Sequence, residues 1–270
     1  MNPTLQHRLK GIHKFLTNSN ERRFFRLSLR HGNSERYKPE KINFLQFKFD
    51  VPDALSFIWQ FKEIFVEEYY RFETKSESPV IYDCGANVGT SCAYFKYQYP
   101  KSRIIAFEPN ANVAEYLLRN IKNNSFQNIK VINKAVWTNS NGLELGLDDA
   151  DASSIHLDKN KTKVNSVRLK EYLEKEEVVD MLKMDIEGSE IEVLKDCEES
   201  LTRVRNLFVE FHSYKDKPQK LSEIIQVLES AGFRYFIMQP ESRESPLINH
   251  VNKSNPGMDL QLNIFAYRSD

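Results

Sequence analysis

Hydrophobic residues along the chain follow two different periods, and their alternation predicts the fold. Short apolar runs typical of buried strands alternate with longer segments in which apolar residues recur every three or four positions, as on one face of a helix. The predicted strands are Val80–Asp83, Arg103–Phe107, Ile129–Asn133, Val178–Ile186, Asn206–His212, Phe233–Met238 and Leu260–Tyr267, and the predicted helices are Val88–Tyr99, Ala111–Asn123, Ser189–Leu201 and Pro218–Ala231. This order predicts an α/β fold with a doubly wound, mostly parallel sheet and helices on both faces.

One connection departs from the alternation. Between the third and fourth strands, residues 135–158 indicate a hairpin and loop with Asn141–Gly142 as turn residues, and a helix is predicted at Val167–Glu176. The helix that starts at Ser189 carries Glu192 three residues later, which is the pattern of a capping box.

The first 78 residues follow a different pattern. It predicts an amphipathic helix over residues 5–16, turns and short pieces over 18–41, a strand over 42–51, and a helix from 52–53 to Phe72 with Trp59 on its buried face. We therefore expect residues 1–78 to form a basic arm and a helical and strand extension packed on the core. Residues 79–270 are expected to form the Rossmann-like domain.

Composition adds three constraints. A hydrophobic fraction of 40% is enough for a sizeable core and excludes a disordered chain. The whole chain is formally neutral, but residues 1–48 hold 11 Lys/Arg against 3 Asp/Glu, a local net charge of +8 that leaves −8 on the remainder. The basic arm could contact an anionic membrane surface peripherally, as an amphipathic helix, or pack on its own domain or on a subunit partner; we favour packing.

Location follows from what the sequence lacks. The three cysteines, Cys84, Cys92 and Cys197, form no C-x-x-C pair, which favours buried thiols in a reducing compartment. No apolar stretch reaches the roughly 18 residues that span a bilayer, and the basic N-terminus has no apolar signal core. A cytoplasmic protein without a transmembrane segment is expected.

A glycine-bearing turn follows the first strand of the domain and indicates a ligand site. Gly85 can adopt backbone angles closed to other residues, and the helix that follows offers free N–H groups. Glu108 lies 19 residues after Gly89, close to the spacing of roughly 20 at which an acid binds ribose hydroxyls.

The nature of that ligand follows from the glycines and from one acid. The G-x-x-x-G spacing lacks the glycine that admits a pyrophosphate, and Asp83 would repel phosphates but attract a sulfonium and an ammonium. These features favour S-adenosylmethionine over a dinucleotide. The alternative is a turn without a ligand in which Asp83 only caps a helix, and we consider it weaker because Glu108 stands at the expected distance.

A second cluster ends the fourth and fifth parallel strands. Lys183 and Asp185 share one face of their strand, and Glu210 and His212 share one face of the next. Together they supply a base, an acid and a cation, and Asp185 or His212 could accept the proton of an acceptor hydroxyl. The alternative is a buried ion pair of Lys183 with Asp185 or Glu210, beside a satisfied histidine. Asp185, Glu210 and His212 could also hold a metal, although none is predicted.

Four motifs carry a family resemblance. They are DCGANVG at 83–89, FEPN at 107–110, KMDIEGSE at 183–190 and VEFH at 209–212, and with them roughly residues 40–235 resemble the FkbM family of methyltransferases. The resemblance implies a class I, Rossmann-like methyltransferase fold, S-adenosylmethionine as donor, and O-methylation of a hydroxyl on a sugar, a glycan or a natural-product-like small molecule. Cys84 departs from the aliphatic residue expected at its position, without consequence for any role.

The resemblance also implies roles for individual residues. It places a donor loop at Asp83, Gly85, Ala86, Asn87 and Gly89, the ribose at Glu108 with Pro109 and Asn110 beside it, adenine near Ala135, and the acceptor beside Asp185, Glu187 and His212 with Lys183 and Glu210 as further catalytic candidates. A nucleic-acid methyltransferase is a weaker alternative, because the chain has no Asn/Asp-Pro-Pro-aromatic motif for flipped bases, and no nucleic-acid partner is expected. A non-catalytic, methyltransferase-like binding module is the third interpretation. The sequence predicts neither the acceptor nor the oligomeric state.

Overall fold

The central element of the molecule is a seven-stranded sheet. The computed structural model describes residues 16–147, 153–154, 161–240, 242–252, 255 and 257–268. The strands of this sheet are β3 (Val80–Cys84), β4 (Arg103–Phe107), β5 (Ile129–Ile132), β11 (Val179–Met184), β12 (Val204–Tyr214), β13 (Arg234–Met238) and β14 (Met258–Tyr267). Their order is β13-β14-β12-β11-β3-β4-β5, and β14 runs antiparallel to both of its neighbours. The other neighbours are parallel, as predicted.

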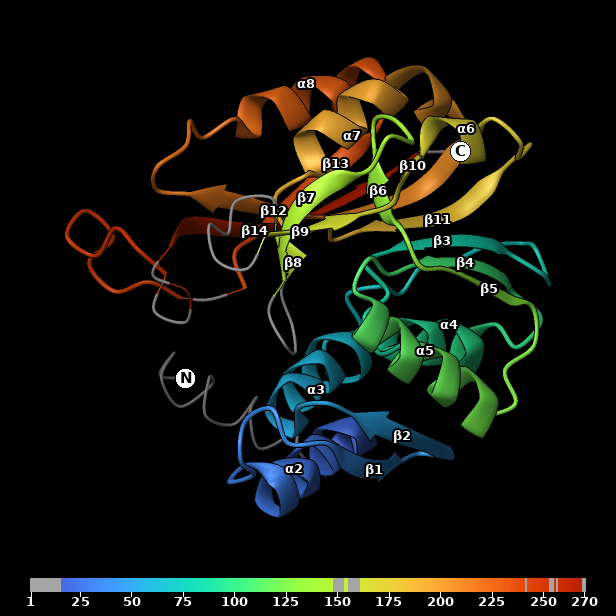
Figure 1. Ribbon diagram of the computed structural model, residues 1–270, viewed down its shortest axis with the longest axis vertical. Helices are drawn as coiled ribbons and strands as arrows, with labels where there is room; N and C mark the ends of the chain where they lie inside the picture. Colours follow the sequence, from blue (N-terminus) through green and yellow to red (C-terminus); the bar gives the residue numbers. More distant parts are fainter. Residues whose placement is uncertain are drawn as a thin grey trace, which may run out of the picture.

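Helices cover both faces of the sheet (Figure 1). The two sets are α4 (Thr90–Gln98) and α5 (Ala111–Asn123) on one face, and α6 (Lys170–Leu173), α7 (Glu190–Cys197) and α8 (Leu221–Ser230) on the other. The buried side chains form two apolar clusters. The prediction of a doubly wound α/β fold is confirmed.

The order of the strands fixes where a ligand can enter. The chain runs outward from β3 through β4 to β5, and it then returns to the opposite side of β3 with β11. At such a switch point the connections leave β3 and β11 in opposite directions, which opens a crevice at their carboxyl ends. Both sequence clusters follow these strand ends, so the topology places them at one crevice.

Residues 16–79 form an extension below α4 and α5 (Figure 1). It comprises α2 (Ser19–His31), β1 (Glu40–Phe44), β2 (Phe47–Val51), α3 (Ala54–Phe61) and a π-helical turn, η1 (Lys62–Val66). Phenylalanine rings at positions 44, 49, 57, 61 and 65 form the buried centre of the extension, with ring centroids 5.2–6.0 Å apart. Such aromatic burial is a large stabilising contribution for a short segment.

Asn120 of α5 joins the extension to the sheet. Its side-chain amide donates to the carbonyls of Asp50 (3.0 Å) and Val88 (2.9 Å), and its oxygen accepts from the Asp50 N–H (2.7 Å). The residue is fully buried, so these bonds satisfy polar groups that water does not reach. One amide therefore bridges the β2 edge and the turn that follows β3.

Four expectations for the extension were wrong. A helix, α2, replaces the turns predicted over residues 18–41, and a hairpin with a left-handed residue at Leu45 (φ 48°) replaces the single strand over 42–51. The second helix begins after its cap Asp53 as expected, but it ends at Val66 rather than Phe72. Trp59 is exposed instead of buried. The predicted helix over 5–16 lies almost wholly outside the described residues.

The connection between β5 and β11 also differs from its prediction. It contains β6 (Ala135–Trp137), β7 (Leu143–Leu147), β8 (Ser153–Ser154), β9 (Lys161–Val164) and β10 (Ser166–Arg168). β7 pairs antiparallel with β8 and β9, whereas β6 pairs parallel with β10. The turn at Asn141–Gly142 therefore precedes β7 without joining two paired strands, and the predicted helix over 167–176 shortens to α6.

The start of α7 lacks the side-chain cap predicted for it. The Ser189 side chain makes no capping hydrogen bond, and instead the Glu190 carboxylate accepts from the N–H groups of Ile186 (3.1 Å) and Gly188 (3.0 Å). The expected capping box is thus wrong, and an acid that the sequence analysis did not select fixes the loop after β11.

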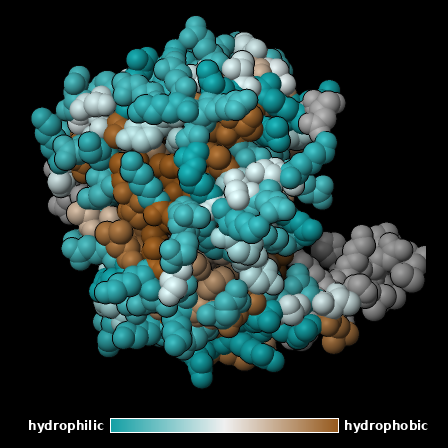
Figure 2. Space-filling view, turned by 90° about the vertical axis from the view of Figure 1, so that its right-hand side faces the viewer, coloured by the Kyte–Doolittle hydropathy of each residue, from teal (hydrophilic) through white to brown (hydrophobic). Residues whose placement is uncertain are grey.

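The surface is mostly hydrophilic, with an apolar band on the face shown in Figure 2. Within the described residues, every helix is too short or too polar to cross a bilayer.

Candidate active site

The turn after β3 lies directly against the end of β11. The N–H groups of Gly85 and Ala86 donate to the Phe107 carbonyl (3.0 and 2.8 Å), which folds the turn over β4. Gly85 has φ 88°, and a Cβ atom there would overlap the Asp185 carbonyl oxygen. Glycine is therefore required at this position both for the backbone angle and for the close approach of the two strands.

Glu108 lies at the end of β4 and is held rigidly. Its carboxylate accepts from the N–H groups of Asn87 (3.0 Å) and Asn110 (2.9 Å). Burial raises the pKa of Glu108 to about 7, although these two backbone donors act in the opposite direction. A buried carboxylate that lines a cavity and has its orientation fixed is suited to accept hydrogen bonds from the hydroxyls of a ribose.

Lys183 is the buried cation of the site. Its Nζ atom donates to the Gly85 carbonyl (2.6 Å) and lies 3.6 Å from Asp83 Oδ1 and 3.3 Å from Asp185 Oδ2. Burial would lower the pKa of Lys183, but the charge of Asp185 leads the contributions that raise it well above its ordinary value. Lys183 therefore stays charged and ties the donor loop to both strand ends.

Asp83 is completely buried, and its side chain lies beneath the donor loop. Oδ2 accepts from the Ser91 hydroxyl (2.5 Å), and Oδ1 faces Lys183. The carboxylate does not line the cavity described below. The sequence analysis left open a buried ion pair of Lys183 with Asp185 or with Glu210. The structure contains the pair with Asp185, and Asp83 lies beside the same cation.

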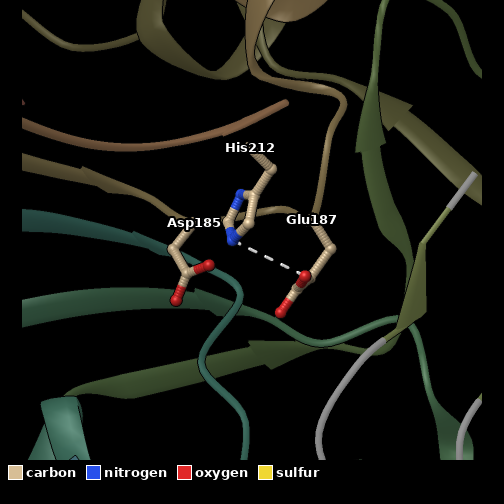
Figure 3. Close-up of side chains that lie close together, drawn as sticks. All are labelled: Asp185, Glu187 and His212. Carbon is tan, nitrogen blue, oxygen red and sulfur yellow. Dashed lines mark ion pairs between the residues drawn. The ribbon is translucent and has the colours of Figure 1, made fainter. Parts of the chain in front are cut away.

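His212, from β12, lies in a group of carboxylates (Figure 3). Its Nδ1 atom is 3.1 Å from Glu190 Oε1, and its Nε2 atom is 3.6 Å from Glu187 Oε2 and 3.8 Å from Glu210 Oε1. Burial would lower the pKa of His212, but the charges of Glu187 and Glu190 raise it well above its ordinary value. This direction favours the charged ring over the neutral one, and the role of His212 as a proton acceptor stays a prediction.

Glu210 and Asp185 complete this group. Glu210 accepts a hydrogen bond from Gln261 of β14, and burial, followed by the charge of Asp185, raises its pKa above the usual range. Asp185 is partly exposed, with a quarter of its side chain accessible. These two carboxylates and Glu187 face the cavity.

A cavity of about 790 Å³ runs along the carboxyl ends of the strands. The candidate residues that line it are Gly85, Ala86, Asn87, Glu108, Pro109, Asn110, Ala135, Lys183, Asp185, Glu187 and Glu210. Asp83, Gly89 and His212 lie behind this lining. The sequence residues thus converge on one cavity, and their individual roles remain predictions.

The opposite wall comes from the extension, which the sequence analysis did not connect with the site. It includes Arg36, Trp59, Gln60, Lys62, Glu63, Tyr69 and Tyr70, and Gln261 contributes from β14. Lys62 lies over the Trp59 ring, 5.1 Å from its centroid. Helical periodicity placed Trp59 on the buried face, so nothing in the sequence pointed to this wall.

Comparison with known proteins identifies the family. Residues 83–235, more than half of the chain, match the profile described as "Methyltransferase FkbM domain". The chain belongs to the FkbM methyltransferase family. It is therefore an S-adenosylmethionine-dependent methyltransferase of the FkbM type, and the resemblance inferred from the four motifs is confirmed.

Several known methyltransferases are similar to this chain in sequence. Methyltransferase sdnD of Sordaria araneosa is 29% identical over 64% of this chain and 80% of its own length. Hexuronic acid methyltransferase AglP of Haloferax volcanii is 24% identical over 62% of this chain and 71% of its own. Among solved structures, an FkbM methyltransferase from Methylobacillus flagellatus is 15% identical, covers 90% of this chain and 58% of that one, and has a TM-score of 0.49.

The cavity fits S-adenosylmethionine as the donor. The backbone at Gly85 can approach a ligand closely, and Glu108 presents an oriented carboxylate to a ribose. Asp185, Glu187 and Glu210 supply negative charge for a sulfonium and an ammonium. When bound, the donor supplies an electrophilic methyl group, and the chain has to orient an acceptor beside it.

Proposed function

We propose that this FkbM enzyme transfers the methyl group of S-adenosylmethionine to a hydroxyl oxygen of a sugar or of a related polyhydroxylated small molecule. The observation that carries the proposal is the composition of the cavity. One wall holds the donor loop and Glu108, and the other presents an aromatic ring among cationic, anionic and amide side chains. Carboxylates of Asp185, Glu187 and Glu210 also line the cavity and can accept a proton.

The wall formed by the extension supports a sugar acceptor. Trp59 is more than half exposed, and Gln60 and Glu63 follow it closely along the chain. An exposed ring offers an apolar face for the C–H side of a sugar, and the polar groups beside it can exchange hydrogen bonds with hydroxyls. Arg36 and Lys62 add positive charge that suits an acidic sugar. The name of the relative AglP, a hexuronic acid methyltransferase, agrees with this class.

The proton of the acceptor hydroxyl needs a carboxylate. In the arrangement described, the surrounding acids favour the charged form of His212, and Lys183 is engaged with Asp185 and the Gly85 carbonyl. Asp185 and Glu210 line the cavity and remain as the candidates. A general base of this kind contributes about 10²–10⁴-fold to the rate.

A labelling experiment tests the reaction type. The protein is incubated with tritiated S-adenosylmethionine and a panel of neutral and acidic mono- and oligosaccharides, and the product is treated with mild alkali. A methyl ether survives this treatment, whereas a methyl ester is hydrolysed. We expect an alkali-stable product; an alkali-labile product, or transfer only to nitrogen-containing acceptors, contradicts the proposal.

Two substitutions assign the proton acceptor. Asp185→Asn and Glu210→Gln keep the size of each side chain and remove its charge. The variant that loses the base should fall in kcat by about 10²–10⁴-fold while it still binds the donor. Glu199→Gln, at an exposed carboxylate far from the cavity lining, is the matched control. Unchanged kcat in both cavity variants refutes the assignment.

A further inference from the structure

His212 is oriented in the way that metal-binding histidines are oriented. A carboxylate can only accept a hydrogen bond, so the short contact between Nδ1 and Glu190 Oε1 fixes a proton on Nδ1. Glu190 is itself fixed, because it also accepts from two backbone N–H groups and is almost fully buried. A carboxylate on one ring nitrogen is the usual outer partner of a histidine whose other nitrogen binds a metal.

The second ring nitrogen faces carboxylates at distances too long for hydrogen bonds. Nε2 lies 3.6 Å from Glu187 Oε2 and 3.8 Å from Glu210 Oε1. Ligand atoms of Asp185, Glu187 and His212 all lie within 4.8 Å of one another (Figure 3). Around an ion with bonds of about 2.1 Å, adjacent ligand atoms are separated by about 3.0 Å and opposite ones by about 4.2 Å. Small side-chain movements would therefore bring the three ligand atoms to coordinating distances.

The charge of the pocket is also suited to a cation. The side chain of His212 is surrounded by the carboxylates of Asp185, Glu187, Glu190 and Glu210. The Nζ atom of Lys183 contacts Oδ2 of Asp185. Like charges this close together repel one another. A divalent ion would offset this repulsion. Asp185 and Glu187 line the cavity, so an ion has a path from solvent.

We infer that Asp185, Glu187 and His212 form a divalent cation site, with Glu190 as the outer residue that orients the histidine. Carboxylates suit Mg²⁺ and Mn²⁺, and the single imidazole shifts the preference toward Mn²⁺. The site lies where the proposed function places the acceptor, and the inference rests on that proposal for its role in the reaction. A bound cation would hold an acceptor oxygen and lower the pKa of its hydroxyl. Asp185 would then act as a ligand, which leaves Glu210 to take the proton.

Manganese binding tests the site without any acceptor. The protein is stripped of metal with EDTA and titrated with MnCl₂, and free Mn²⁺ is followed by electron paramagnetic resonance. We expect one Mn²⁺ per chain. Asp185→Asn and His212→Gln should abolish this binding, whereas Glu190→Gln, which keeps an acceptor oxygen for the backbone N–H groups, should weaken it by roughly 10–100-fold. Glu199→Gln should bind as the wild type does.

Folding and donor binding are measured alongside for every variant. Circular dichroism and calorimetry with 5′-methylthioadenosine, in EDTA, show whether a variant that binds no Mn²⁺ still has a formed cavity. Absence of Mn²⁺ binding by a wild-type protein that binds the nucleoside overturns the site and leaves the proposed function intact. Binding that survives Asp185→Asn and His212→Gln also overturns it. Specific Mn²⁺ binding without methyl transfer to any sugar supports the site and removes the proposed acceptor class.

Discussion

The buried carboxylate of Glu108 makes donor binding depend on pH in a calculable way. A ribose hydroxyl donates its hydrogen bond to an ionised carboxylate, and the pKa of Glu108 before binding is raised to about 7. Roughly a tenth of the unbound protein carries the ionised form at pH 6 and roughly nine-tenths at pH 8. Because only that fraction is ready to bind, the apparent affinity should be roughly tenfold weaker at pH 6 than at pH 8.

The choice of ligand isolates this effect. 5′-Methylthioadenosine retains the ribose and adenine of the donor but lacks its titratable amino acid moiety. Isothermal titration calorimetry at pH 6, 7 and 8 gives the affinity. At pH 7, buffers with different ionisation enthalpies should report the release of about half a proton per ligand bound, because about half of the Glu108 carboxyl groups are still protonated.

A substitution at the same position provides the control. Glu108→Gln cannot ionise, so its affinity should be lower than that of the wild type at pH 8 and flat between pH 6 and 8. Other groups near the cavity remain in this variant, and any slope that survives belongs to them. Equal affinity of the wild type at pH 6 and 8, or the same slope in both proteins, would refute the assignment of Glu108.

The folding stability of the unliganded protein should change with pH in the opposite direction to the nucleoside affinity. The folded chain keeps the Glu108 proton up to about pH 7, whereas the unfolded chain releases it near 4.5. The folded state therefore binds more protons in this window, and this group adds stability as the pH falls from about 7 to 4.5. Chemical denaturation of the wild type and of Glu108→Gln across this range measures the contribution by difference.

Three further substitutions test the geometry of the cavity. Gly85→Ala should abolish binding of 5′-methylthioadenosine in calorimetry, because the new Cβ would overlap the Asp185 carbonyl and the backbone conformation alone costs about 1–2 kcal/mol. Lys183→Met should lower the free energy of unfolding by about 3–5 kcal/mol in urea titrations, because it leaves the buried Asp83 without its cation; a loss below 1 kcal/mol would contradict the ion-pair argument. Trp59→Ala should raise KM for the acceptor and leave nucleoside affinity and thermal stability unchanged, and an unchanged KM would remove this ring from the acceptor wall.

The sheet could be predicted because its signals are local. The helix at Ala111–Asn123 matches its predicted bounds, since apolar residues at helical spacing follow an asparagine cap. The turn at Gly85 and the acid at Glu108 could be placed because each directly follows one of two consecutive predicted strands. These strands pair side by side and in parallel, so the two residues lie at the same edge of the sheet. In both cases, a short stretch of sequence was enough to predict the local structure.

The extension was harder to predict because tertiary contacts override its local pattern. The helix α2 buries only Leu27, and its many charged residues, followed by Gly32 and Pro39, favoured turns although its apolar residues recur with helical spacing. The reversal between β1 and β2 has no glycine, proline or asparagine, and a leucine adopts the left-handed angle instead. Trp59 has helical spacing, yet it lies on the side of the helix that forms the cavity wall.

The environment of His212 could not be read from its own segment. Its neighbours Glu187 and Glu190 come from the loop and helix after β11, and Glu210 lies on the same strand. The sequence showed that acids and a histidine share the end of the sheet. It could not show that Glu190 points at Nδ1, because this orientation depends on the two backbone N–H groups that hold the carboxylate.

The amide of Asn120 has a consequence for the size of the smallest independently folding piece. The matched segment, 83–235, includes this asparagine and its partner Val88 but excludes Asp50, which supplies the other two hydrogen bonds. A shortened protein starting near residue 79 would keep one of the three hydrogen bonds of that amide and would uncover Tyr94 and Phe126, which now contact rings of the extension. We expect such a fragment to aggregate. The segment that matches the family is therefore smaller than the smallest piece that we expect to fold independently.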